Sequence, residues 1–219
     1  MSAAQEWDSW KTPPPKDVKP APKAGEKAPV NENLTLPSDK PTLIVFLRHC
    51  GCPFAEKTFK QLTNISAIYK GDLNCVAVSH SSQEATERWV IQVGGNWDVT
   101  MVVDHERELY AQWGLGISNT WHVLSPASLY KVFQLGKSEH IWNRPTESGS
   151  RWQVSGAFTV DRDSSVRWAQ VAASADDMPK FEEAILSVGL DPKRLRVGDG
   201  ELKKLRAGAD GIRREGLSG

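Results

Sequence analysis

The sequence predicts a single α/β domain in which a β-sheet carries helices on both faces. Short apolar runs rich in branched residues alternate along the chain with segments of helical periodicity, which is the pattern of repeated strand–helix units. The last two apolar runs flank the turn Asp161–Ser164 and precede one more helical segment, which indicates a closing hairpin and helix. A chain of 219 residues is long enough to bury a sizeable core in one domain.

The elements follow from these patterns in order. Strands are expected at 42–48, 73–79, 99–103, 156–161 and 165–171. Helices are expected at 53–70, 83–93, 106–113, 126–135 and 177–188, and residues 137–152 are expected to form a long loop. Ser81 or Ser82 can cap the second of these helices, and Gly94-Gly95 can end it. Asp104 can cap the third.

The two ends of the chain differ in composition from its centre. Lys, Ala and Pro dominate from Lys11 to Lys27, so we expect residues 1–28 to form a disordered or loosely packed segment before a domain at 29–189. Within it, Trp7 and Trp10 could pack back on the domain or dock a partner, and packing back is the simpler interpretation. Residues 190–219 are rich in glycine and basic residues, which predicts a flexible tail.

Charge and composition exclude several classes of partner. The 27 basic and 27 acidic residues cancel, so there is no global electrostatic case for nucleic acid or an anionic membrane. No apolar stretch approaches the ~20 residues of a membrane helix, and the N-terminus has no signal-peptide core. Three cysteines do not make a secreted disulfide framework. We therefore expect a cytoplasmic protein in a reducing compartment.

Cys52 lies where a buried strand meets a helix. Leu43–Leu47 is an unbroken apolar run, whereas the residues after Pro53 have helical spacing, with Glu56 and its polar neighbours on the exposed side. Proline suits the first helical position. The first turn of a helix favours a thiolate, which is the nucleophilic form of cysteine. The alternative is a buried, inert cysteine; the Cys-Pro pair at this junction favours a reactive thiol.

Cys50 is a candidate partner for Cys52. On an extended segment, residues two apart point the same way, and Gly51 would ease a small strained ring. A strained disulfide is easily reduced, which suits catalysis or sensing. Equally, Cys50 could simply pack as the last residue of the strand. Cys75 lies within an apolar strand and is expected in the core.

No motif for a cofactor or metal stands out, and we expect neither. His49, Cys50 and Cys52 could be metal ligands, but no second Cys/His cluster provides zinc spacing. An iron–sulfur cluster shared between two subunits is the remaining metal alternative. The other histidines, His80, His105, His122 and His140, are expected to be hydrogen-bonded or exposed. The aromatic and arginine residues of loop 137–152 could shape a pocket near Cys52 or simply staple the loop to the domain.

The order of several segments resembles the thioredoxin fold, and within it the peroxiredoxin-like alkyl hydroperoxide reductase/thiol-specific antioxidant family. The segments are Gly25–Pro29, Val76–Glu84, Val102–Gly114 and Gly156–Asp161. The resemblance covers roughly residues 24–188 and implies a central mixed sheet flanked by helices on both faces. Residues 115–153 look like a helix–loop insertion peculiar to a subgroup.

The resemblance assigns the peroxidatic position to Cys52, with departures around it. His49 stands where the family has a threonine, and Ala55 replaces the second cysteine of a thioredoxin pair. Ser155 stands where the family has an arginine before the hairpin glycine, and Val45 where it has a proline. Other cations are therefore needed, and the nearest are Arg48, Arg144 and Arg151.

The resemblance implies a thiol-dependent oxidoreductase in which Cys52 attacks a peroxide or a disulfide. Cys50 or an external thiol would then form a disulfide, and thioredoxin or glutathione would reduce it. The expected substrate-binding residues are Arg48, His49, Pro53, Ser155 and Arg151. Relatives often form homodimers through the sheet edge. The second hypothesis is a redox-sensor or protein-interaction module with little turnover, which the motif departures favour and the retained Cys52-Pro53 opposes.

Overall fold

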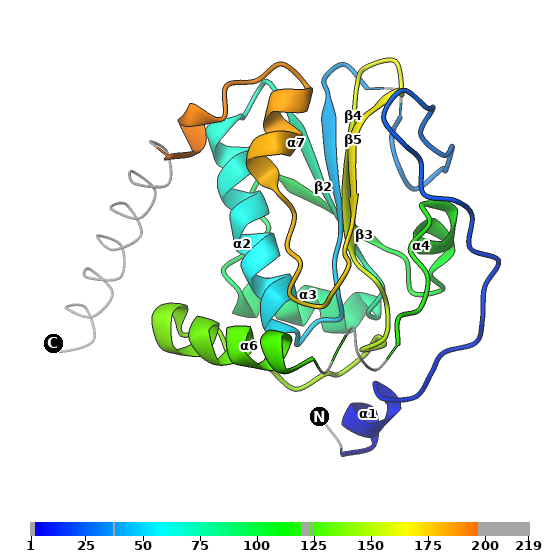
Figure 1. Ribbon diagram of the computed structural model, residues 1–219, viewed down its shortest axis with the longest axis vertical. Helices are drawn as coiled ribbons and strands as arrows, with labels where there is room; N and C mark the ends of the chain where they lie inside the picture. Colours follow the sequence, from blue (N-terminus) through cyan, green and yellow to red (C-terminus); the bar gives the residue numbers. More distant parts are fainter. Residues whose placement is uncertain (1–2, 37, 120–122, 124, 197–219) are drawn as a thin grey trace, which may run out of the picture.

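The fold is built on one five-stranded mixed sheet, shown in the computed structural model of Figure 1. The structure describes residues 3–36, 38–119, 123 and 125–196. The strands are β1 (Thr42–Phe46), β2 (Asn74–Ser79), β3 (Val99–Val103), β4 (Gly156–Val160) and β5 (Val166–Val171). Their spatial order is β3-β2-β1-β4-β5, with β1 parallel to β2, β2 parallel to β3, and β4 antiparallel to both β1 and β5. The α/β class and the mixed sheet are confirmed.

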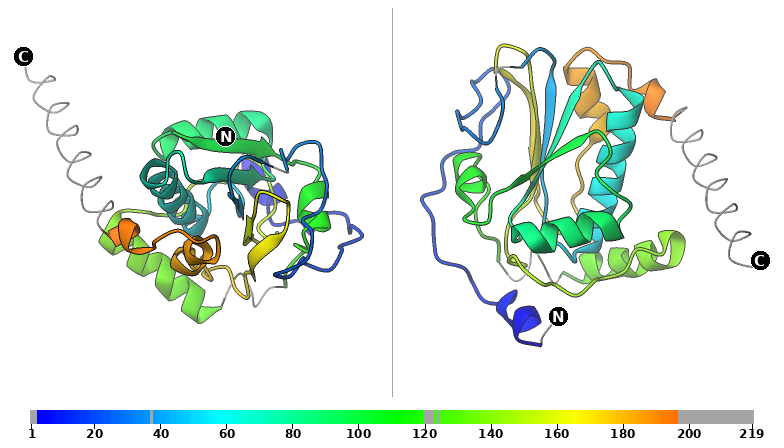
Figure 2. Two further views of the ribbon diagram at one scale, coloured as in Figure 1. Left: turned by 90° about the horizontal axis from the view of Figure 1, so that it is seen from above. Right: turned by 180° about the vertical axis from the view of Figure 1, so that it is seen from behind.

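Helices cover both faces of the sheet, as Figures 1 and 2 show. The helices are α1 (Ala3–Asp8), α2 (Pro53–Ile68), α3 (Gln83–Gln92), α4 (Glu108–Gln112), α6 (Pro126–Glu139) and α7 (Phe181–Ser187). Leu43 and Val45 of β1 face the core under α2, α3 and α7. Ile44 and Phe46 face the opposite core, which α4 and the N-terminal segment cover. All five residues of β1 are buried, which explains its unbroken apolar run.

Three of the expected boundary residues act as the sequence indicates. The Ser82 hydroxyl caps α3 by accepting a hydrogen bond from Ala85 N at 3.3 Å. Asp104 accepts hydrogen bonds from the N–H groups of Glu108 at 2.9 Å and Tyr110 at 3.0 Å, ahead of α4. Gly94 follows the end of α3 with a positive φ. Local polar chemistry therefore sets these helix ends.

Several elements differ from the expected ones. The closing helix begins at Phe181 and not at 177, because the Asp177 carboxylate is engaged by Ala173 N and Gln170 Nε2 in the preceding turn. α6 runs to Glu139, beyond the expected end at 135. The short helix α1 was not expected. These differences leave the order of the elements unchanged.

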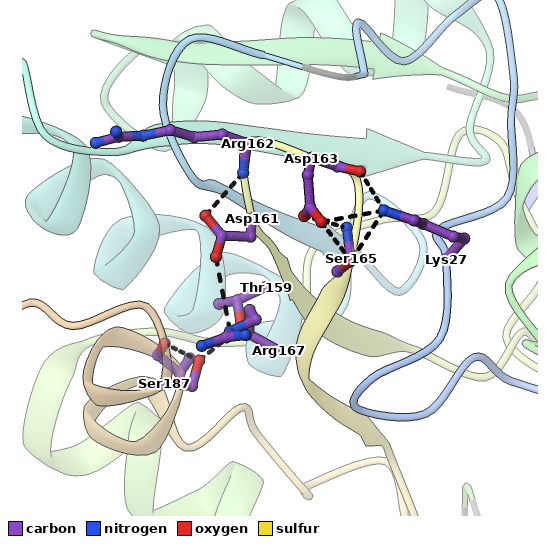
Figure 3. A network of polar contacts seen from close by, with 9 residues as sticks. Lys27, Thr159, Asp161, Arg162, Asp163, Ser165, Arg167 and Ser187 are labelled. Atoms are coloured by element: carbon purple, nitrogen blue, oxygen red, sulfur yellow. Dashed lines mark hydrogen bonds and ion pairs between the residues drawn. The ribbon is translucent and has the colours of Figure 1, made fainter.

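The segment before β1 packs along the domain. Gly25 N donates to Val166 O, and Val166 N donates to Glu26 O, each at 2.8 Å. Beside this pairing, Lys27 Nζ binds the backbone and side chain of Asp163 and the Ser165 hydroxyl at the tip of the hairpin (Figure 3). The composition of residues 1–28 gives no sign of these contacts. The boundaries of the domain at 29 and 189 stay predictions.

The start of the C-terminal segment also contacts the domain. Arg194 binds Asp72 at 2.8 Å and stacks over the Tyr69 ring at 4.5 Å. Residues 197–219 of the expected tail lie outside the described residues. Among the helices that the structure describes, none is both long and apolar enough to cross a membrane.

Candidate active site

A tight turn joins β1 to α2 and carries both candidate cysteines. Cys52 N donates to His49 O at 3.1 Å, and Gly51 has a φ of 129°, which favours glycine. A Cβ atom at Gly51 would lie 2.9 Å from Arg144 O and 3.0 Å from Thr146 Oγ1, so space also requires glycine. β1 ends at Phe46, before the expected boundary at 48. The expectation that Cys50 and Cys52 share one side of an extended segment is therefore wrong.

Cys52 is the N-cap residue of α2, and Pro53 is the first residue of the helix. Glu56 N donates to Cys52 O at 3.1 Å and closes the first helical turn. The N–H groups of Phe54 and Ala55 precede that bond and have no acceptor within the helix. They form part of the positive end of the helix dipole, which begins directly after Cys52 in the chain, although the Cys52 side chain makes no cap hydrogen bond with them. The junction that the sequence predicted is confirmed.

The Cys50 thiol points toward the end of β2 and the start of α3. Its Sγ lies 3.7 Å from Ser79 Oγ and 4.0 Å from Thr86 Oγ1, and Cys50 N donates to Ser81 Oγ at 3.2 Å. Burial raises the pKa of the Cys50 thiol, and the hydrogen bonds with these hydroxyl groups only partly oppose it. Cys50 is therefore held as a neutral thiol at neutral pH.

Cys75 lies in the core, as the sequence indicated. Its side chain is buried within the cluster under α2, and burial raises the pKa of its thiol to about 12. All three cysteines are free thiols in this structure.

A cavity of about 290 Å³ opens beside Cys50, between α3 and the loop that follows α6. Besides Cys50, its lining residues are Ala85, Trp89, Gln92, Arg144, Pro145 and Glu147. The Trp89 indole is buried, and its Nε1 finds no acceptor among the described residues. Cys52 is not part of this lining.

The insertion loop is anchored to the first turn of α2. Arg144 Nε donates to Glu56 Oε2 at 2.8 Å, and Arg144 N donates to Gly51 O at 3.0 Å. Burial alone would raise the pKa of Glu56, but hydrogen bonds from Arg144 and Lys60 outweigh it and hold that pKa below its usual value. Glu56 was expected on the exposed side of the helix; this is wrong, because the side chain is only 2% exposed beneath Arg144. Its charge is balanced by a residue 88 positions away.

A second set of contacts joins the N-terminal helix to His49. The Thr146 hydroxyl lies 3.2 Å from His49 Nδ1 and accepts from Arg151 Nη2 at 3.0 Å. Arg151 forms a salt bridge with Glu6, and Thr146 N donates to Glu6 Oε2 at 2.7 Å. Burial, then the charges of Arg48 and Arg151, hold the pKa of His49 well below its usual value. His49 is therefore neutral.

The N-terminal aromatic residues complete this contact. Arg151 stacks over the Trp10 ring at 4.6 Å, and Trp152 Nε1 donates to Trp10 O at 2.8 Å. Trp10 therefore contacts the domain, as expected, although 36% of its surface stays exposed, whereas Trp7 is 69% exposed.

Arg48 is a buried guanidinium with spare donors. Its side chain is 4% exposed, and Nη2 donates to Arg151 O at 2.7 Å. Nε and Nη1 are buried and find no acceptor in the part of the chain that the structure describes. Unpaired donors of this kind are uncommon in folded proteins, because each one costs solvation free energy.

The structure brings most of the expected site residues to one end of the sheet. Arg48, His49 and Pro53 share the turn with the cysteines, and Arg151 joins them through its contact with Arg48. Ser155 lies at the same end, because the next residue, Gly156, pairs with Phe46.

The other histidines are not part of a metal centre in the described residues. His80 is buried against Tyr110 and Ser150 O, and burial lowers its pKa to about 4. His105 and His140 are exposed, and His122 lies outside the described residues. No group of three or more His, Cys, Asp or Glu side chains in the described part could hold a metal ion.

Sequence analysis missed several residues of the site. These residues are far from Cys52 in the chain and were not singled out as site residues, although they meet at the same end of the sheet: Glu6, Ser79, Thr86, Trp89 and Thr146. The apolar and polar periodicity of their own elements gave the only signal, and it does not report contacts between elements.

The architecture and the Cys-Pro helix start define a thioredoxin-like thiol oxidoreductase. The family described as AhpC/TSA antioxidant enzyme matches residues 59–174, and the chain belongs to this family. This membership supports a peroxiredoxin-type thiol oxidoreductase and not the interaction module. The matched residues begin after Cys52, so the match itself does not assign the nucleophile. Among curated proteins, none matches the chain.

Several solved structures resemble this chain, and the first of them shows the same fold. A peroxiredoxin-like protein from Aquifex aeolicus has a TM-score of 0.54 and 18% identity, covering 81% of this chain and 90% of its own. A thiol peroxidase from Chromobacterium violaceum has a TM-score of 0.48 and 16% identity, covering 77% and 87%. The peroxidoxin BcpB from Mycobacterium tuberculosis has a TM-score of 0.48 and 15% identity, covering 80% and 97%.

Proposed function

We propose that the protein is a peroxidase that reduces peroxides with Cys52 as the nucleophile. The observation that carries this proposal is the place of Cys52, which is the N-cap residue of α2 after the tight turn that follows the central strand β1. The thiolate attacks one oxygen of the peroxide, the O–O bond breaks, and Cys52 becomes a sulfenic acid. The other oxygen leaves as an alkoxide or hydroxide and takes up a proton.

We infer that two kinds of donor stabilise the charge that develops in this step. The first-turn N–H groups of Phe54 and Ala55 are one kind. The second is Arg48, which we assign in place of the arginine that Ser155 lacks, because its Nε and Nη1 are unpaired. Arg144 and Arg151 are less suited to this role, since each already pairs with a glutamate.

We infer that Cys50 then resolves the sulfenic acid. Its sulfur displaces water from Cys52 and forms a Cys50–Cys52 disulfide, which an external thiol reduces. Because the Cys50 side chain is held by Ser79 and Thr86, the turn must rearrange for the two sulfurs to meet. A transient disulfide of this kind fits a cytoplasmic, reducing setting. The proposal includes a homodimer that forms through β3, the last strand at one edge of the described sheet. The other edge strand, β5, is less suited because residues 25–27 border it.

Mass spectrometry after one equivalent of hydrogen peroxide tests the proposal. We expect the wild type to lose two hydrogen atoms and to show a Cys50–Cys52 link, while Cys50→Ser stops at a Cys52 sulfenic acid. Cys75→Ser is the matched control and should behave like the wild type, because Cys75 pairs with Leu43 near the start of β1, whereas the turn follows the other end of that strand. If Cys52 stays reduced while the unfolded chain oxidises, the peroxidase proposal is wrong.

Cys50 is the second candidate nucleophile, because its thiol and not that of Cys52 lines the cavity. Cys52→Ser separates the two. Loss of the peroxide reaction assigns the attack to Cys52, whereas a sulfenic acid on Cys50 at the wild-type rate would reassign it.

A further inference from the structure

Access to the two sulfurs is unequal. Cys50 and Cys52 are each only 5% exposed, but Cys50 lines the cavity of about 290 Å³ under α3. A molecule small enough to enter this cavity can therefore reach Cys50. A cysteine on the surface of another protein has no such route, because the protein that carries it is too large to enter the cavity and bring its sulfur to bonding distance of Cys50.

Several hydrogen-bond donors that line the cavity are not fully used by acceptors of the described residues. Trp89 Nε1 is buried without an acceptor, and an indole nitrogen can only donate. Arg144 uses Nε and Nη2 on Glu56, which leaves Nη1 outside that pair. Gln92 adds an amide, and the one carboxylate in the lining, Glu147, is already held by Arg88 at 2.6 Å. These groups suit a ligand that carries carboxylate or carbonyl oxygens.

We propose that this cavity binds a low-molecular-weight thiol bearing carboxylates, and that this thiol reduces the enzyme by attacking Cys50. The inference rests on the proposed function, since it takes the Cys50–Cys52 disulfide as its substrate. It names the class of reductant, which the peroxidase proposal leaves open. A cavity of this volume lies at the lower end of the roughly 300–1,000 Å³ of small-molecule sites, which suits a thiol of short-peptide size.

The reduction takes two balanced steps. The thiolate of the first small molecule attacks Cys50 Sγ, a new S–S bond forms, and the Cys50–Cys52 bond breaks with its electron pair on Cys52. Cys52 is the leaving sulfur, because Cys50 and not Cys52 lines the cavity from which the small thiolate attacks. A second small thiolate then attacks the sulfur of the molecule bound to Cys50. The bond to Cys50 breaks, Cys50 takes up a proton, and the two small molecules leave joined as a symmetrical disulfide.

Reduction kinetics of the full-length protein test this inference. The chain is oxidised with one equivalent of hydrogen peroxide and mixed with glutathione or, separately, with reduced thioredoxin. The ratio of the reduction rate to the oxidation rate is then compared among variants. Gln92→Glu places a negative charge in the cavity, Trp89→Phe removes one donor, and Gln83→Glu makes the same charge change at the other end of α3 as the control.

We expect glutathione to reduce the wild type faster than thioredoxin does. Gln92→Glu should lower the glutathione ratio about fivefold and Trp89→Phe about threefold, with Gln83→Glu unchanged, since one hydrogen bond or charge contact is worth about this much. With limiting glutathione, peptide mapping should find the mixed disulfide on Cys50. Faster reduction by thioredoxin, no effect of the cavity variants, or a mixed disulfide on Cys52 would each overturn the inference.

Failure of the peroxidase proposal is seen separately. It shows in the oxidation step, before any thiol is added, as the absence of a Cys50–Cys52 link. The cavity is then tested without peroxide, by treating the reduced Cys52→Ser protein with glutathione disulfide. Cys50 should form the mixed disulfide and release one glutathione, more slowly in Gln92→Glu than in Gln83→Glu. No mixed disulfide on Cys50 overturns the inference by itself.

Discussion

Thr146 supports the active-site turn through a single hydroxyl group. That group contacts His49 Nδ1 and Arg151 Nη2, and it lies against Gly51. Thr146→Val keeps the shape of the side chain but removes the hydroxyl group that His49 and Arg151 contact. Thr146→Ser keeps the hydroxyl and loses only a methyl group, so it is the matched control.

We expect Thr146→Val to slow the peroxide reaction of Cys52 about fivefold, because a turn that loses one buried hydrogen bond holds the thiol less well, and a hydrogen bond is worth about 1 kcal/mol. Thr146→Ser should stay within about twofold of the wild type. Stopped-flow oxidation at several pH values measures both rates. Equal slowing in the two variants would show that the methyl group, and not the hydroxyl, matters.

Glu56 has a buried charge on which Arg144 and the insertion loop depend. Since hydrogen bonds from Arg144 and Lys60 keep the pKa of Glu56 low, the group is ionised throughout the neutral range. Glu56→Gln should lower the free energy of unfolding by about 1–3 kcal/mol, because a charged hydrogen-bonded pair is lost in a buried place. The control is Glu139→Gln, which breaks a more exposed pair with Lys57 and should cost about 0.5 kcal/mol or less. Urea denaturation compares the two; equal losses would contradict a special role for Glu56.

At the scale of elements, helix α1 acts as a clamp on the loop that covers the active-site turn. Glu6 binds Arg151 and Thr146 N, and Ser9 O accepts from Arg151 N at 3.0 Å. Asp8 on the same helix forms an exposed ion pair with Lys11. Glu6→Gln therefore removes one charge from the clamp, and Asp8→Asn removes one charge from the same helix outside the clamp.

Glu6→Gln should speed hydrogen exchange of the amides in residues 144–152 several-fold, since about 1 kcal/mol of local stability is lost. Asp8→Asn should leave that exchange as it is. Hydrogen exchange followed by peptide mass spectrometry resolves the segment. Unchanged protection in Glu6→Gln would mean that the loop holds its place without α1.

The elements that local sequence determines were predicted well. The buried run of β1 and the Cys-Pro pair located the start of α2, and Ser82 located the start of α3. α1 and the pairing of residues 25–26 with Val166 were missed, because both depend on partners more than 130 residues away. Composition reports how much apolar surface a segment can bury, but it does not report such partners.

At the scale of the whole molecule, distant parts of the chain meet at one end of the sheet. The N-terminal helix, the turn after β1 and the loop after α6 are joined through Glu6, His49, Thr146 and Arg151. The sequence named His49 and Arg151 as site residues but could not pair them, since their contacts run through Thr146. The order of the elements was predictable because the hydrophobic periodicity is local; the polar network was not, because it forms only after the chain has folded.

This end of the molecule also makes stability depend on pH. His80 is buried, and burial lowers its pKa to about 4, whereas the pKa of a histidine in the unfolded chain is about 6.5. Between these values the unfolded chain binds more protons than the folded one, so stability falls as the pH falls from about 6.5 to about 4. The contribution of His80 over that window is about 3 kcal/mol, and buried His49 adds to it in the same direction.

Urea denaturation at pH 7.5 and pH 4.5 measures this loss. His80→Gln should lose about 2–3 kcal/mol less than the wild type between the two pH values, because glutamine does not titrate. His105→Gln removes an exposed histidine and should lose as much as the wild type. Asp176, whose pKa is about 2, titrates below this pH window. The raised pKa of Asp104 opposes the loss of stability on acidification, and it does so equally in the wild type, His80→Gln and His105→Gln. An unchanged loss in His80→Gln would show that His80 is protonated in the folded state without penalty, and that other groups produce the acid sensitivity.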